Sequence, residues 1–195
     1  METKAEILTQ VDQYLQLYPD KKEDLRSFID FVNRFDGAQL FDRKNFTGHL
    51  TASAFIIPPN GDELLLLRHK FLNRWLQPGG HIDVSDANLM AAALREAEEE
   101  TGISAKNLLP VTCNIFDFNS HHIPENTRKH ELPHMHHDCR FLFTCTELPD
   151  INLAADESTD SKWISFAALK NDAEFAEVTE RIKAVLKTNP VNSSI

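Results

Sequence analysis

Two stretches near the N-terminus repeat apolar residues at helical spacing. The first set comprises Ile7, Val11, Tyr14 and Tyr18, and the second comprises Leu25, Phe28, Ile29, Val32 and Phe35. Since an α-helix has 3.6 residues per turn, each set lines one face of a helix. Pro19 and Asp20 separate the sets, so the pattern predicts a helical hairpin. Its apolar stripes need a partner surface, which is either the rest of the chain or a second copy in a homodimer.

Apolar runs of strand length follow a polar connector. Residues 50–57 and 63–68 flank Pro58-Pro59-Asn60-Gly61, a sequence typical of a turn, and therefore predict a β-hairpin. Further strands are expected at residues 109–116, 138–146 and 162–165, and a terminal helix is expected around Phe175, Val178, Ile182 and Leu186. Strands mixed with helices predict an α/β fold.

These patterns divide the chain into three parts. Residues 1–46 are expected to form the helical extension and its connector, residues 47–188 the main domain, and residues 189–195 a frayed tail. A chain of 195 residues that is 42% hydrophobic can bury a core of the size expected for one domain with an extension.

Charge and targeting signals narrow the classes of partner. The net charge of −10 opposes binding to nucleic acid or to an anionic membrane, because both depend on basic residues. No stretch has the apolar core of a signal peptide or the ~20 apolar residues of a membrane span, so a cytoplasmic protein is expected. Cys113, Cys139 and Cys145 lack the CxxC spacing of a zinc or redox site and are expected to be reduced, buried thiols.

The densest cluster of carboxylates lies between residues 79 and 103. Glu96, Glu99 and Glu100 stand at i, i+3 and i+4, so their side chains project from one face of a predicted helix. Ligands of oxygen alone suit Mg²⁺ or Mn²⁺. The alternative is a solvated acidic face on which Arg95 pairs with Glu99.

Turn and cap residues frame this helix. Pro78-Gly79-Gly80 interrupts the chain before it, Ser85 or Asp86 can cap its start, and Gly102 can end it in a left-handed conformation.

The segment resembles the Nudix box, whose pattern is Gly, five residues, Glu, seven residues, Arg-Glu-aliphatic-any-Glu-Glu-any-Gly-aliphatic. Residues 95–103 fill the second half in register. In the first half, five residues after Gly80 lead to Asp86 where Glu is usual, and eight residues then lead to Arg95, which we interpret as one inserted loop residue. Residues 75–80 and 163–165 are similar to other landmarks of the family, so the resemblance covers about residues 47–170.

The resemblance implies an α/β/α sandwich around a mixed sheet. It also implies a metal site in which Glu96, Glu99 and Glu100 bind Mg²⁺ or Mn²⁺, helped by the backbone carbonyl at Gly79 or Gly80.

The activity implied is that of a hydrolase that splits the pyrophosphate bond of a nucleoside diphosphate linked to another moiety. In this interpretation Arg95 orients the glutamates, and the base that activates water is Glu99 or Glu157, which stands six residues before Trp163. The substrate is then a small phosphorylated molecule, whose leaving group the sequence leaves open.

A second polar cluster occupies residues 121–138 and is rich in histidine. If the chain is extended from residue 134, then His134, His136, Asp138 and Arg140 share one face, and Cys139, Phe141, Phe143 and Cys145 line the core face. The polar face is expected to contact substrate phosphates or to bind a second, transition metal such as Zn²⁺, Fe²⁺ or Mn²⁺. Otherwise these histidines hydrogen-bond within a polar loop.

Further histidines flank the box region. Gly79-Gly80-His81 and His49 are similar to features of a subset of Nudix sequences with HxPxN and PHxHxD elements, and His81 and His69 are candidates for the same cleft. Two alternatives to the hydrolase stay open: a non-catalytic Nudix module that binds a nucleotide or a partner protein, and isomerase or hydrolase chemistry at the histidine-rich site. The intact glutamate trio argues against the binding module.

Overall fold

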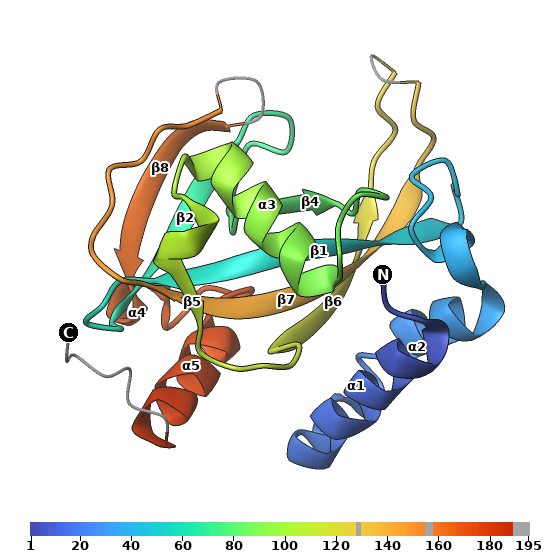
Figure 1. The fold of residues 1–195 in the computed structure, drawn as a ribbon, viewed down its shortest axis with the longest axis horizontal. Helices are drawn as coiled ribbons and strands as arrows, with labels where there is room; N and C mark the ends of the chain where they lie inside the picture. Colours follow the sequence, from blue (N-terminus) through green and yellow to red (C-terminus); the bar gives the residue numbers. More distant parts are fainter. Residues whose placement is uncertain (128–129, 155–157, 189–195) are drawn as a thin grey trace. The chain divides into compact units, whose positions relative to one another are not determined.

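A computed structural model describes residues 1–127, 130–154 and 158–188 (Figure 1). Its helices are α1 (Lys4–Leu17), α2 (Arg26–Arg34), α3 (Leu89–Thr101), α4 (Phe166–Leu169) and α5 (Ala176–Thr188). Its strands are β1 (Gly48–Ile57), β2 (Glu63–His69), β3 (Arg74–Leu76), β4 (Gly79–His81), β5 (Leu108–Pro110), β6 (Asp117–Ile123), β7 (His134–Cys145) and β8 (Ser158–Ser165). The predicted α/β class is confirmed. Among the described helices, none is long and apolar enough to cross a membrane.

The chain forms two compact units, each assembled from separate segments. The first unit comprises Met1–Ser53, Gly80–Ala93 and Asn114–Phe141, and the second comprises Ala54–Gly79, Leu94–Cys113 and Leu142–Ile195.

The strands belong to two sheets. One has the order β4-β1-β7-β5 with β6 also paired to β7, and the other has the order β3-β2-β8. The hairpin predicted from residues 50–68 is therefore wrong, because β1 and β2 lie in different sheets. Strand β1 is buried at every position and has β4 and β7 as its neighbours, whereas β2 pairs antiparallel with β3 and β8.

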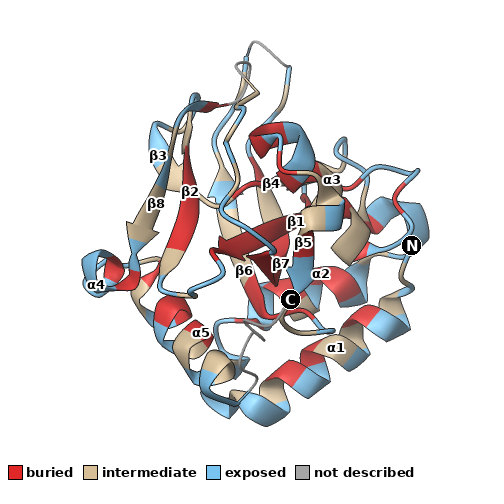
Figure 2. Cartoon of the chain, turned by 60° about the vertical axis from the view of Figure 1, so that its left-hand side comes forward, coloured by how far each residue is buried: buried red, intermediate tan, exposed pale blue. Residues whose placement is uncertain are grey.

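Helices α1 and α2 form the predicted helical hairpin. Their buried residues are Ile7, Val11 and Tyr14 on α1 and Phe28, Phe31 and Val32 on α2, and buried and exposed positions alternate along α1 in Figure 2. The rings of Tyr14 and Phe28 pack edge-on against Phe118 of β6, with centroids 5.2 and 4.9 Å away. The buried residues of both stripes are thus covered within the same chain, while Tyr18, Ile29 and Phe35 are partly exposed.

Strand β6 lies in a segment where the sequence pattern predicts no strand, and the extended alternative from residue 134 is confirmed. The strand expected at residues 109–116 is confirmed only at β5, since β6 begins at Asp117 and β7 already begins at His134. Val111 and Phe116 still donate backbone hydrogen bonds to the carbonyls of Leu142 and Arg140, both at 2.9 Å. The sequence of β6 lacks the apolar alternation typical of a strand, because most of its side chains are polar and face other polar groups of the sheet.

The three cysteines differ in burial. Cys139 and Cys145 are buried as expected, but Cys113 is exposed, because it lies in the segment that leaves β5. Burial raises the pKa of Cys145 to about 12, and burial beside Asp138 raises that of Cys139 well above its usual range. These two thiols therefore stay protonated and are poor nucleophiles.

His137 is a core residue on the face of β7 that packs against α2. Its ring stacks on Phe31 at 4.4 Å with an interplanar angle of 19°, and Ser120 Oγ lies 2.8 Å from its Nδ1. Burial, followed by the charges of His121 and His49, lowers the pKa of His137 to about 4. The folded state therefore favours the neutral ring.

We expect this histidine to make the chain less stable in acid. Because its folded pKa is near 4 and its unfolded pKa near 6.5, the unfolded state binds the extra proton between these values. The contribution is fully present above pH 6.5 and is lost as the pH falls towards 4, amounting to at most about 3 kcal/mol. Urea denaturation from pH 4.5 to 7.5 should show a shallower pH dependence for His137→Gln than for wild type. An unchanged slope in this variant, or an equal change in the exposed control His122→Gln, would contradict the assignment.

Candidate functional site

Helix α3 carries the acidic residues and begins later than the sequence indicated. Asn88 Oδ1 accepts the Ala91 N–H at 2.8 Å, so Asn88 is the N-cap. The predicted caps, Ser85 and Asp86, precede the helix, and Asp86 instead accepts the Asp83 N–H at 2.7 Å. Asn, Asp and Ser are almost equally good caps, so the loop conformation selects among them.

The C-terminus of α3 ends at Gly102 as predicted. Gly102 has φ +72°, and an added Cβ would lie 2.9 Å from the Cβ of Asn152. Asn152 also donates its N–H to the carbonyl of Thr101 at 2.8 Å. Glu98 Oε2 accepts the Ala105 N–H at 3.2 Å, so this glutamate stabilises the turn after the helix. Both ends of the glutamate-bearing helix are therefore held in place.

Arg95 joins two of the predicted metal ligands. Its Nη1 lies 2.8 Å from Glu96 Oε1 and 3.2 Å from Glu99 Oε2. The Glu96 side chain is 11% exposed, whereas that of Glu99 is 59% exposed. The guanidinium thus holds one buried and one accessible carboxylate side by side.

Glu100 is buried and bonded to the glycine turn. Its Oε2 accepts the Gly79 N–H at 2.9 Å, and Gly80 follows in β4. The carboxylate oxygens of Glu96, Glu99 and Glu100 are not among the groups of three ligand atoms within 4.8 Å that occur in the described part of the chain. Their chemistry nevertheless fits a hard cation, because they supply oxygen alone and two of them are removed from water.

Of the two candidate bases, Glu99 and Glu157, only Glu99 lies among the described residues. Glu99 is accessible to water and substrate, since more than half of its side chain is exposed. Glu157 lies outside the described residues.

A continuous polar face runs across three strands of the first unit. Its residues are His49, Thr51 and Ser53 on β1, His134, His136, Asp138 and Arg140 on β7, and Asp117, Asn119 and His121 on β6. The register pairs Asn119 with Asp138 and His121 with His136. Successive strand residues alternate between faces, so this face is opposite the one that His137 presents to α2.

Asp138 and Arg140 are engaged within this face. Asp138 accepts hydrogen bonds from Ser53 Oγ at 2.6 Å and Thr51 Oγ1 at 3.0 Å, and Arg140 Nε lies 3.3 Å from its Oδ2. Arg140 also contacts Asp117 Oδ2 at 3.3 Å. Both residues are buried, which favours a structural role for them over contact with substrate.

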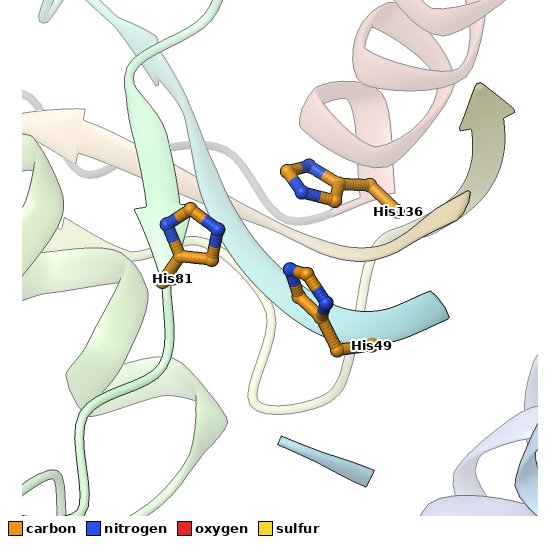
Figure 3. Close-up of side chains that lie close together, drawn as sticks. All are labelled: His49, His81 and His136. Carbon is orange, nitrogen blue, oxygen red and sulfur yellow. The ribbon is translucent and has the colours of Figure 1, made fainter. Parts of the chain in front are cut away.

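Three histidines converge from different strands (Figure 3). One ring nitrogen from each of His49, His81 and His136 lies within 4.8 Å of the other two, and the residues come from β1, β4 and β7. His134 Nε2 is 3.2 Å from His136 Nε2. The sequence pointed to His81, His134 and His136 as site residues, and to His49 only through the family resemblance. The signal for His49 was present, because His49, Thr51 and Ser53 are polar at every second position of an otherwise apolar strand.

Burial keeps the central imidazoles neutral. Burial, followed by the charge of His134, lowers the pKa of His49 to about 4, and the backbone of Asn45 acts in the opposite direction. Burial and then His49 and His81 lower the pKa of His136 well below its ordinary range. At pH 7 both rings carry a lone pair rather than a positive charge.

His69 has a local structural role. Its Nδ1 accepts the N–H of Leu72 at 3.1 Å, which stabilises the turn between β2 and β3.

The sequence matches known proteins over most of its length. The pattern of the NUDIX domain matches residues 47–185. A protein of Lactococcus lactis subsp. cremoris (strain MG1363), described as a probable DHNTP pyrophosphohydrolase, is 35% identical over 125 residues, covering 64% of this chain and 72% of that protein.

Solved structures share the fold. The Ap4A hydrolase of C. elegans, in a binary complex, gives a TM-score of 0.53 at 23% identity and covers 71% of this chain and 98% of its own. The dihydroneopterin triphosphate pyrophosphohydrolase of E. coli gives 0.50 at 17% identity, covering 72% and 94%.

Proposed function

Because the chain belongs to the NUDIX family, we propose that it is a divalent-metal-dependent hydrolase that splits a pyrophosphate bond in a small phosphorylated substrate. The observation that carries the proposal is the arrangement on α3, where Arg95 bridges Glu96 and Glu99 while the Gly79 N–H holds Glu100. A salt-bridged surface helix has no need to bury two of its carboxylates.

The glutamates are the residues that would hold Mg²⁺ or Mn²⁺. When bound, such an ion supplies positive charge to the phosphoryl oxygens during cleavage. Arg95 keeps Glu96 and Glu99 on one side of the helix, and the Gly79 N–H orients the carboxylate of Glu100. Glu99 is accessible enough to take a proton from the attacking water, and Glu157 is the other candidate for this role.

We propose a nucleoside diphosphate linked to another moiety as the substrate class. The description of the Lactococcus relative adds a second class, the pterin triphosphates, in which cleavage also breaks a phosphoanhydride. Both share the pyrophosphate group that carboxylate-held metal would engage.

A release assay tests the activity and names the substrate. Phosphate and pyrophosphate release would be followed for nucleotide sugars, ADP-ribose, NAD, dinucleoside polyphosphates, nucleoside triphosphates and dihydroneopterin triphosphate, with Mg²⁺ or Mn²⁺. We expect turnover of one class, abolished by EDTA and restored by added metal. Binding of a panel compound without turnover under either metal would instead support a non-catalytic module.

A further inference from the structure

We infer that His49, His81 and His136 form a binding site for a divalent transition metal of the zinc type, separate in its ligand chemistry from the glutamates of α3. The three residues come from β1, β4 and β7, and their rings face one another in Figure 3. The ring centroids of His49 lie 5.1 Å from His81 and 4.7 Å from His136, and those of His81 and His136 are 5.2 Å apart. The inference does not depend on the proposed hydrolase activity.

His49 supplies an independent reason for a ligand. Its side chain is 0% exposed. The backbone of Asn45 lies near enough to favour the protonated ring, but neither ring nitrogen makes a hydrogen bond of good geometry within the described part of the chain. Burying an imidazole without hydrogen bonds is unfavourable, because the ring loses its bonds to water. Coordination through one nitrogen would offset this cost.

His134 determines which ring nitrogen of His136 carries the proton. Because Leu132 offers a carbonyl oxygen 2.7 Å from His134 Nδ1, that nitrogen must be the donor, and in the neutral ring Nε2 then accepts. His136 Nε2 lies 3.2 Å from this acceptor and therefore carries its proton. The remaining nitrogen of His136, Nδ1, keeps its lone pair. Hydrogen bonds that fix the tautomer in this way are typical of histidines that bind metal.

The ligand set selects the class of metal. Neutral imidazoles suit zinc and its neighbours, whereas Mg²⁺ prefers oxygen. Nitrogens on one tetrahedral zinc lie about 3.3 Å apart, which follows from Zn–N bonds of about 2.05 Å. The separations of up to 4.8 Å would close by up to about 1.5 Å through side-chain rotation. Three protein ligands leave the fourth position open to water or to a phosphate oxygen.

Zinc binding by the full chain tests the inference. The protein would be stripped with chelator, loaded with Zn²⁺ in millimolar Mg²⁺ so that carboxylate sites are occupied, and desalted before metal analysis. We expect one equivalent of bound Zn²⁺, and Co²⁺ in its place should give the visible absorption of a tetrahedral nitrogen site. His81→Gln and His136→Gln should each lower the Zn²⁺ affinity at least about 100-fold, and His134→Gln about 10- to 100-fold.

The matched control is His122→Gln, which removes an exposed histidine of β6. Circular dichroism reports whether each variant is folded, and ring ¹⁵N shifts of wild type on adding Zn²⁺ identify the ligands without any substitution. No retained Zn²⁺, unchanged ring shifts at these three histidines, or an equal loss in the control would overturn the inference. The Mg²⁺ arm of the hydrolysis assay contains no transition metal, so any of these outcomes leaves that test of the hydrolase unaffected.

Discussion

Replacing Glu100 by glutamine is expected to lower kcat for pyrophosphate hydrolysis by about 100- to 1000-fold, which corresponds to about 3–4 kcal/mol of lost transition-state stabilisation. The amide oxygen of glutamine can still accept the Gly79 N–H that Glu100 accepts at 2.9 Å. The substitution therefore removes the negative charge while keeping the shape and the hydrogen bond. A divalent cation depends on that charge, so the Mg²⁺ concentration for half-maximal activity should also rise.

Glu98→Gln is the matched control on the same helix. Glu98 accepts the N–H of Ala105 rather than facing the predicted metal site, so this variant should retain activity close to that of wild type. Steady-state rates at several Mg²⁺ concentrations and circular dichroism of both variants provide the measurement. If Glu100→Gln stays within about fivefold of wild type while folded, the carboxylate is no metal ligand.

Replacing Arg140 by methionine is expected to destabilise the fold by about 3–5 kcal/mol, because it leaves two buried carboxylates without their shared cation. Arg140 contacts Asp117 and Asp138, both at 3.3 Å, and all three residues are buried. Tyr14 of α1 also donates its hydroxyl to Asp117 Oδ1 at 3.0 Å. The loss should therefore loosen the attachment of the N-terminal helix to β6.

Urea denaturation at pH 7 measures the loss of stability in Arg140→Met. The comparison is a variant that breaks an ion pair on the surface. Arg43 lies 3.0 Å from Glu131, but its side chain is 55% exposed, so Arg43→Met should cost less than about 1 kcal/mol. Equal losses of stability in Arg140→Met and Arg43→Met would show that the buried network contributes no more than a surface pair.

Several local features could be predicted from residue order. The helical hairpin, the extent of α3 around its glutamates and the left-handed end at Gly102 follow from spacing within one or two turns. The shared face of His134, His136 and Asp138 follows in the same way, since side chains of an extended strand alternate. Periodicity specifies which residues share a face of an element because this property depends on local geometry alone.

Other features depend on which elements meet, and no local pattern specifies that. Asn88 rather than Ser85 or Asp86 caps α3, because the loop positions only one of three chemically similar residues at the helix start. Strands β1 and β2 join different sheets because β1 has β4 and β7 as its neighbours.

The histidine cluster depends both on local sequence pattern and on which strands meet. Alternation along β1 and β7 assigns His49 and His136 to polar faces, and the glycine turn precedes His81. Their convergence within 4.8 Å arises from pairing between strands that are distant in sequence. The residue pattern thus determines the chemistry that each strand carries, whereas long-range strand pairing determines which of these groups meet, because pairing is a property of the assembled sheet.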